Sequence, residues 1–400
     1  MELSDRARSI PPSITLAISA QVKEMKAAGK EIIAFGAGEP DFDTPRKISD
    51  VAIESLLSGS THYMPSSGTP EARQAIAHKL KTENNIDCTQ ANISINAGAK
   101  MSINLSLMSI LDPNKNQEVV VPTPAWVSYK PMIELAGGTM VEVPTTVESS
   151  FKCTPEEIEA AITSNTKAIM LNTPSNPCGT MYSPEELRAI AQMLEGHPGI
   201  YILSDEIYER LIYSDIKHLS LGSIVEIADR VITINGLSKA YAMTGWRIGY
   251  ACAPEPVAKA MNTLQSQLNT CITSFCYAVI PVALGMQNEV EEMRQIFARR
   301  AALMNELIGN WPNVQCATPT GAFYAFPKIS YYFGKTSPAG TEMTDAVNFT
   351  KALLEETGVA VVPGTDFGGC GPNHIRLSFA CSEEQITEGV NKVGAWLEKF

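Results

Sequence analysis

The chain has 400 residues, of which 44% are hydrophobic and 18% are charged, and this composition excludes an intrinsically disordered protein. At about 150 residues per domain, the length predicts two to three domains, or one large α/β lobe with a smaller companion. The formal net charge is −12 and no stretch gathers basic residues, so we expect no nucleic-acid partner.

The first stretch, residues 13–45, has no predicted strand partner close to it in the chain, so we expect it to pack against a C-terminal lobe or to reach a partner chain. From residue 93 onward, short β-branched runs alternate with helical patterns. Two of these helices, at 154–162 and 183–194, are marked by a Thr or Ser cap, a following Pro and a Glu three residues after the cap. This alternation favours a mostly parallel sheet covered by helices. Seven strands are predicted, at 93–96, 119–121, 139–143, 167–171, 200–204, 231–235 and 248–251.

The pattern changes after the seventh strand. A long polar helix is predicted at 286–300, followed by a helix that ends near Trp311 and by β segments at 321–326 and 374–380. These elements predict a second lobe of the α+β type.

The nine cysteines and five histidines are scattered and form no CxxC pair. This distribution predicts reduced thiols and neither a disulfide framework nor a metal site. The first ten residues lack the apolar core of a signal peptide, and no apolar run approaches the length of a membrane span. We therefore expect a soluble cytoplasmic protein without a membrane partner.

Ligands of parallel sheets bind beyond the carboxyl ends of the strands, so the residues that follow each strand matter most. Gly98, Ala99 and Lys100 follow the first predicted strand and precede an apolar helix. Free backbone N–H groups at such a turn can hold an anion, although a glycine there is also typical of a plain tight turn. The glycine patterns of dinucleotide and P-loop sites are absent.

Polar residues also follow the central strands. Asp205 stands at the end of one strand with Tyr208 three residues later, and Asn176 lies in a stiff, Pro-rich loop. Taken singly, each has a plain structural interpretation, as a capping Asp, a surface Tyr or a turn Asn.

Lys239 is surrounded by small and apolar residues after the strand at 231–235. Lost hydration there would lower its pKa and make the amine a nucleophile or base, as Schiff-base chemistry requires. The alternative is a lysine whose ammonium reaches solvent.

Eight motifs occur in the order found in one known family. They are GAGEPDFDTP at 36–45, HYMPSSGTPEARQAI at 62–76, AGAK at 97–100, PAWVSYKPM at 124–132, NPCG at 176–179, SDEIY at 204–208, SKAYAMTGWRIGY at 238–250 and RLSFA at 376–380. Through these motifs the chain resembles the class I pyridoxal-phosphate (PLP) aminotransferases over almost its whole length. Within them it most resembles the bacterial branch that contains aspartate and prephenate aminotransferases.

The resemblance implies the fold type I of PLP-dependent transferases, with a seven-stranded, mostly parallel large domain and a smaller α+β domain drawn from both chain ends. The expected boundaries are an N-terminal arm and first part of the small domain at 1–46, a large PLP-binding domain at 47–290, and the rest of the small domain at 291–400. It also implies a homodimer with shared active sites.

The resemblance further implies roles for single residues. Lys239 would carry PLP covalently, Asp205 would bind the ring nitrogen, and Tyr208 and Asn176 would bind the phenolic oxygen. Trp126 would stack on the ring. The phosphate would be held by Gly98, Ala99, Lys100, Ser238, Arg247 and Tyr63 of the partner subunit.

Substrate binding is expected to centre on Arg376. In the run 374–379, alternation places Ile, Leu and Phe on one face of a strand and Arg376 on the other. Its planar fork suits a carboxylate, and the resemblance implies that it binds the substrate α-carboxylate with help from Trp126, Asn176 and the Gly38 backbone.

Specificity depends on the second carboxylate of the substrate. Some aspartate aminotransferases use an arginine of the partner chain, but between residues 261 and 293 this sequence has no Lys or Arg. The branch it resembles uses a lysine and hydroxyls that match Lys100, Ser13 and Thr15. Relatives active on prephenate carry a basic residue where this chain has Pro11, so we do not expect activity on prephenate.

The resulting hypothesis is a ping-pong transfer of the amino group of L-aspartate to 2-oxoglutarate, giving oxaloacetate and L-glutamate. Alternatives on the same fold are an aminotransferase with alanine, aromatic or prephenate/arogenate specificity, and a PLP-dependent C–S lyase or cyclising synthase. A PLP-binding regulator would need a DNA-binding domain, and a nicotinamide enzyme would need the missing glycine fingerprint.

Overall fold

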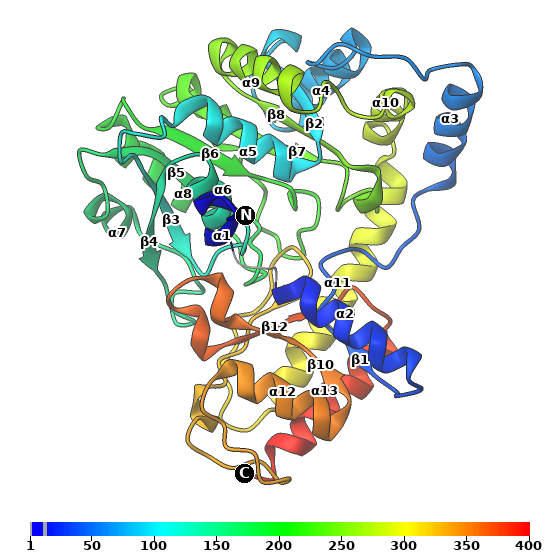
Figure 1. Ribbon diagram of the computed structural model, residues 1–400, viewed down its shortest axis with the longest axis vertical. Helices are drawn as coiled ribbons and strands as arrows, with labels where there is room; N and C mark the ends of the chain where they lie inside the picture. The colour runs from blue at the N-terminus through cyan, green and yellow to red at the C-terminus, as the bar shows by residue number, and fades with distance from the viewer. Residues whose placement is uncertain (1, 11–13) are drawn as a thin grey trace.

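The computed structural model describes residues 2–10 and 14–400. Its upper lobe is built on a seven-stranded sheet (Figure 1), in which β8 is antiparallel to both neighbours and the other neighbours are parallel. All seven predicted strands lie in this sheet, and its mostly parallel character is confirmed. In spatial order the strands are β2 (Ile93–Ala97), β8 (Ile248–Cys252), β7 (Val231–Gly236), β6 (Tyr201–Asp205), β5 (Thr166–Asn172), β3 (Glu118–Thr123) and β4 (Thr139–Pro144).

Helices bury both faces of the sheet. Along β3, Val119 and Val121 pack on one face with α5 (Ala99–Ile110), α6 (Tyr129–Leu135) and α9 (Glu255–Leu268), whereas Val120 packs on the other with α7 (Pro155–Ala160) and α8 (Pro184–Glu195). Burial on both sides explains why the strands read as continuous apolar runs. Both α7 and α8 begin with the predicted capping box, in which the cap and a Glu side chain exchange hydrogen bonds with the backbone.

A further apolar cluster covers the β2–β8 edge of the sheet. It joins α3 (Arg46–Leu57), α4 (Pro70–Glu83) and α10 (Val279–Leu284) to the side chains of these two strands. In Figure 1, α3 lies at the outer margin of the molecule, away from the lower lobe.

The lower lobe combines segments from both ends of the chain. The N-terminal strand β1 (Ile33–Ala34) pairs in parallel with β10 (Val359–Ala360), so the prediction that the early segment packs against a C-terminal lobe is confirmed. A second small sheet has the order β11-β12-β9. The remaining elements are α2 (Ile14–Ala27), α11 (Gln287–Gly309), β9 (Tyr324–Ala325), α12 (Ala346–Thr357), β11 (Val362–Pro363), β12 (Ile375–Ser378) and α13 (Glu383–Leu397). The short helix α1 (Asp5–Ser9) is drawn in the region of the upper lobe in Figure 1.

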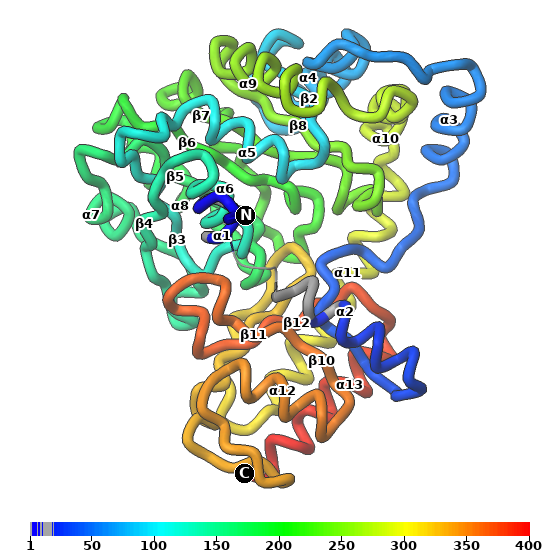
Figure 2. The backbone as a smooth tube through the Cα atoms, in the orientation of Figure 1, coloured from blue at the N-terminus to red at the C-terminus, as the bar shows by residue number. Residues whose placement is uncertain are grey.

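One element differs from the prediction. The two helices expected at 286–300 and before Trp311 are a single helix, α11, because neither Pro nor Gly interrupts the chain before Gly309. Figure 2 shows α11 running from beside α10 into the lower lobe. Its first turns pack in the upper lobe through Val290 and its later turns in the lower lobe through Phe297. The exact domain boundaries therefore stay a prediction. No helix in the described part of the chain is long and apolar enough to span a membrane.

Candidate active site

A cavity of about 500 Å³ lies at the carboxyl ends of the central strands, where residues of both lobes meet. It gathers residues that are far apart in the sequence, from the segment after β1 to strand β12. Of the predicted site residues, the cavity is lined by Gly38, Ala99, Lys100, Trp126, Asn176, Asp205, Tyr208, Ser238, Lys239, Arg247 and Arg376.

Two predicted residues in the described part of the chain do not line this cavity. Gly98 lies just behind its wall, against the guanidinium of Arg247. Tyr63 is 88% exposed on the surface, as a residue that serves a partner subunit would be. Ser13, like Pro11, lies outside the described residues, so its predicted role stays untested.

Lys239 points into the cavity and not to solvent. The chain turns tightly after β7, where the Met243 N–H donates to the Ser238 carbonyl, and this turn aims the side chain inward. Its Nζ donates to the Gly38 carbonyl at 2.5 Å. Burial, reinforced by the positive charge of Arg376, lowers the pKa of Lys239 to about 8. The amine can therefore gain or lose a proton near neutral pH.

Asp205 is a buried acid with two neutral hydrogen-bond donors. Its Oδ2 accepts from the Tyr129 hydroxyl at 2.6 Å, and its Oδ1 accepts from the Ile207 N–H at 3.2 Å. Burial raises the pKa of Asp205 to about 6, although both hydrogen bonds oppose the rise. A cation that reached the carboxylate would be strongly favoured.

Tyr129 was not predicted from the sequence. Burial and the neighbouring Asp205 raise its pKa well above the usual value, so the hydroxyl keeps its proton and donates. Its ring also meets Trp126 edge to face, with 5.5 Å between the centroids. The signal for it was the motif PAWVSYKPM, which places Tyr129 three residues after Trp126.

Arg376 is 2% exposed and lines the cavity from β12, while Ile375 and Leu377 pack in the lower core. The predicted alternation along this strand is thus confirmed. Its Nη1 donates to Asn176 Oδ1 at 3.0 Å and its Nη2 donates to the Gly36 carbonyl at 3.1 Å, while its buried Nε has no partner among the described residues. The guanidinium lies 4.7 Å above the ring of Tyr324.

Tyr324 is a second residue that the sequence did not reveal. Its hydroxyl lies 3.0 Å from the hydroxyl of Tyr208, which places both phenols at the wall shared by the two lobes.

The turn before α5 forms a concave, positively charged corner. Gly98 has φ of +82°, and a Cβ there would lie 2.4 Å from Arg247 Nη2, so only glycine permits this approach. Ala99 and Lys100 begin α5, where backbone N–H groups lack partners within the helix. Lys100 Nζ lies 4.8 Å from the Trp126 ring centroid, and burial together with Arg247 lowers the pKa of Lys100. This corner suits an anion.

Residues 30–393 match the family model described as aminotransferase class I and II. The chain belongs to this aminotransferase family. An aspartate/prephenate aminotransferase of Cereibacter sphaeroides is 42% identical over 98% of both chains, and an aspartate aminotransferase of Bacillus subtilis is 42% identical over 100% of both. Among solved structures, the aspartate aminotransferase of Rhizobium meliloti covers 100% of this chain and 99% of its own with 37% identity and a TM-score of 0.94. That of Thermus thermophilus with maleate covers 99% of both, with 38% identity and a TM-score of 0.91.

These comparisons confirm the predicted family, the α/β fold and the class of enzyme, a transaminase. They do not test the roles predicted for single residues, the cofactor or the dimer.

Proposed function

We propose that this aminotransferase uses PLP to transfer the amino group of L-aspartate to 2-oxoglutarate, giving oxaloacetate and L-glutamate in a ping-pong cycle. The observation that carries the proposal is the meeting, in one cavity, of a lysine of lowered pKa, a buried acid, an anion-binding corner and an arginine. The names of relatives at 42% identity support aspartate as the donor.

The cavity fits PLP on two points. Within the described residues the carboxylate of Asp205 receives hydrogen bonds from two neutral donors, Tyr129 and Ile207, so a protonated ring nitrogen would bring the missing positive charge. The corner at Gly98 and Arg247 would hold the phosphate with Ser238. When bound, PLP supplies an electron sink for the carbanion at the substrate Cα.

The chain itself supplies proton transfer and orientation. With a pKa of about 8, the Nζ of Lys239 can take a proton from the substrate Cα and return one as a general acid. Arg376 offers a planar, bidentate partner to the α-carboxylate, and its guanidinium is held against the Tyr324 ring. Trp126 would cover one face of the cofactor ring, as the family resemblance implies.

Lys100 supports a dicarboxylate substrate. Its ammonium lies in the cavity wall against Trp126 and comes from α5, whereas Arg376 lines the same cavity from β12. Maleate, named with the Thermus thermophilus aspartate aminotransferase, is a four-carbon dicarboxylate like aspartate. Prephenate, which also carries two carboxylates, is the second candidate substrate because the Cereibacter sphaeroides relative is named for it.

A homodimer would complete the site. Tyr63 is 88% exposed, and nearby α3 exposes Ile53 by 51% and Leu57 by 81%. Apolar side chains gathered in this way are typical of an interface, and a partner there would allow Tyr63 to reach the phosphate corner of the other subunit. A cytoplasmic location stays a prediction, supported by nine cysteines that are all free thiols.

The substitution Lys239→Ala tests the proposed chemistry. The variant should still bind PLP, without the covalent link, and should show no transamination of L-aspartate with 2-oxoglutarate. Lys392→Ala, which removes an exposed lysine of α13, is the control and should keep full activity. Normal turnover by Lys239→Ala would refute the role of Lys239.

A further inference from the structure

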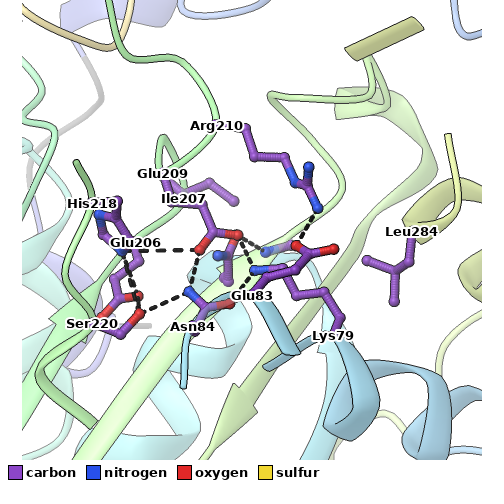
Figure 3. A network of polar contacts seen from close by, with 12 residues as sticks. Lys79, Glu83, Asn84, Glu206, Ile207, Glu209, Arg210, His218, Ser220 and Leu284 are labelled. Atoms are coloured by element: carbon purple, nitrogen blue, oxygen red, sulfur yellow. Dashed lines mark hydrogen bonds and ion pairs between the residues drawn. The ribbon is translucent and has the colours of Figure 1, made fainter. Parts of the chain in front are cut away.

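A second polar centre, shown in Figure 3, includes Glu206 and Glu209 of the turn at residues 205–209, neither of which lines the cavity. Asp205 and Tyr208 face the cavity. Glu206 and Glu209, also three residues apart, instead contact a cluster that includes His218 and Lys79. The turn is closed by the Glu209 N–H, which donates to the Glu206 carbonyl at 2.9 Å.

Glu206 is fully buried, and its carboxylate is satisfied by three donors. Oε1 accepts from Ser204 Oγ at 2.8 Å, and Oε2 accepts from Ser220 Oγ at 2.5 Å and from His218 Nε2 at 2.9 Å. Burial opposes the protonation of His218, but Glu206 and Glu209 outweigh it and raise the pKa of His218. The Glu206–His218 contact is therefore a buried hydrogen bond that becomes an ion pair when His218 is protonated.

Glu209 is held in the same way from α4. Its Oε1 pairs with Lys79 Nζ, and its Oε2 accepts from Asn84 Nδ2 at 2.5 Å. The side chains of Glu209 and Lys79 are only 9% and 4% exposed. Asn84 also donates to Ser220 Oγ at 2.8 Å and accepts from Lys79 at 2.7 Å, so one continuous network joins both carboxylates.

The cluster contains the residue types of a metal site, since ligand atoms of Glu206, Glu209 and His218 lie within 4.8 Å of one another. However, hydroxyl, amide and ammonium donors already occupy the carboxylate oxygens. Lys79 balances the charge of Glu209, and His218 balances that of Glu206 when it is protonated.

Buried ion pairs contribute little to stability compared with apolar packing, because desolvation offsets their attraction. Such a pair does fix the orientation of its side chains, because its hydrogen bonds are satisfied in one geometry only. Here that geometry fixes both ends of a short turn whose other face presents Asp205 and Tyr208.

We propose that Glu206 and Glu209 are positioning residues, which clamp the turn at 205–209 from behind so that Asp205 and Tyr208 meet the cofactor in the productive geometry. The inference rests on the proposed function, because it assigns these two side chains to PLP. It predicts that the clamp acts on the reaction step and on PLP binding and leaves substrate capture by Arg376 and Lys100 unchanged.

The test uses the holoenzyme with Glu206→Gln and Glu209→Gln, which keep the side-chain shape and remove the charge. We expect kcat to fall by about tenfold to a hundredfold, the Kd for PLP to rise at least about tenfold, and the absorbance maximum of bound PLP to shift. The KM for L-aspartate should stay within about twofold, because Arg376 and Lys100 come from other segments. His218→Gln keeps a donor near Glu206 and should give smaller changes of the same kind. This variant takes the place of Glu206→Gln in the test if Glu206→Gln does not fold.

The matched control is Glu83→Gln, since Glu83 lies at the edge of the same network but bonds to Arg210 and Gln287. It should leave all four quantities unchanged. Folded variants of Glu206 and Glu209 with normal kcat, PLP affinity and spectrum would overturn the clamp. Variants that lose thermal stability but keep these three quantities would overturn it as well. Stoichiometric metal in the purified holoenzyme, with activity lost on chelation, would also overturn it in favour of a metal site. If the unaltered holoenzyme fails to transaminate aspartate, the proposed function fails, while the PLP affinity and spectrum still test the clamp.

Discussion

Replacing Asp205 by Asn should stabilise the cofactor-free protein above pH 6 while lowering kcat of the loaded enzyme at least about a hundredfold. The reason is that burial raises the pKa of Asp205 from 3.8 to about 6. The folded state therefore binds this proton more tightly than the unfolded state, and raising the pH through this window removes stability. At 1.36 kcal/mol for each unit of pKa, the loss is about 3 kcal/mol once both states are ionised.

Asn is neutral at every pH, so the variant should not lose stability as the pH rises. Part of this gain is offset because the Asn side chain places an amide donor near the Ile207 N–H. We expect the free energy of unfolding of Asp205→Asn to exceed that of the unaltered protein by about 1–3 kcal/mol at pH 8. Between pH 8 and pH 5 about 1.4 kcal/mol of this gain should disappear, because the buried carboxyl of the unaltered protein becomes protonated.

The assay is urea unfolding of both cofactor-free proteins at pH 5 and pH 8, with Asp215→Asn as control. Asp215 is exposed, and its replacement should change stability by less than about 0.5 kcal/mol at either pH. A difference between Asp205→Asn and the unaltered protein that is the same at both pH values would refute the reasoning. So would a variant that is less stable at pH 8.

Three further substitutions test the substrate and cofactor contacts. Lys100→Ala should raise the KM for aspartate about tenfold more than the KM for alanine, as expected for one lost charged contact; equal effects in steady-state assays would contradict its role at the second carboxylate. Arg376→Lys should raise the KM of every amino donor about a hundredfold, because an ammonium cannot replace the bidentate fork; an effect confined to aspartate would argue against binding of the α-carboxylate. Tyr129→Phe should weaken PLP binding about tenfold in a fluorescence titration through loss of the 2.6 Å bond to Asp205, and an unchanged Kd would show that this bond does not support the cofactor.

The sheet could be predicted because its signals are local. Each strand is a short apolar run such as β3. The helices α7 and α8 start at capping boxes, which can be recognised in the sequence from a Thr or Ser followed three residues later by Glu. The break expected within α11 was wrong because a helical pattern with a change in polarity does not mark an end unless a Gly or Pro accompanies it.

The candidate site could be predicted only in part. Residues that follow strands directly, such as Asp205 and Lys239, could be identified from their position in the chain. Tyr324 could not, because it reaches Tyr208 from a segment 116 residues away. The clamp depends likewise on Lys79, which lies 130 residues from Glu209. Such pairs arise from tertiary packing, which leaves no periodic signal in the sequence.

The most direct test of the proposed function is a panel of amino donors assayed with 2-oxoglutarate on the purified holoenzyme. L-aspartate should give oxaloacetate and L-glutamate with a kcat/KM at least about tenfold above that for alanine, phenylalanine or glutamine, since under the proposed function only a dicarboxylate would engage both Lys100 and Arg376, which line the same cavity. Turnover of L-aspartate no faster than that of alanine or phenylalanine would contradict the proposed function.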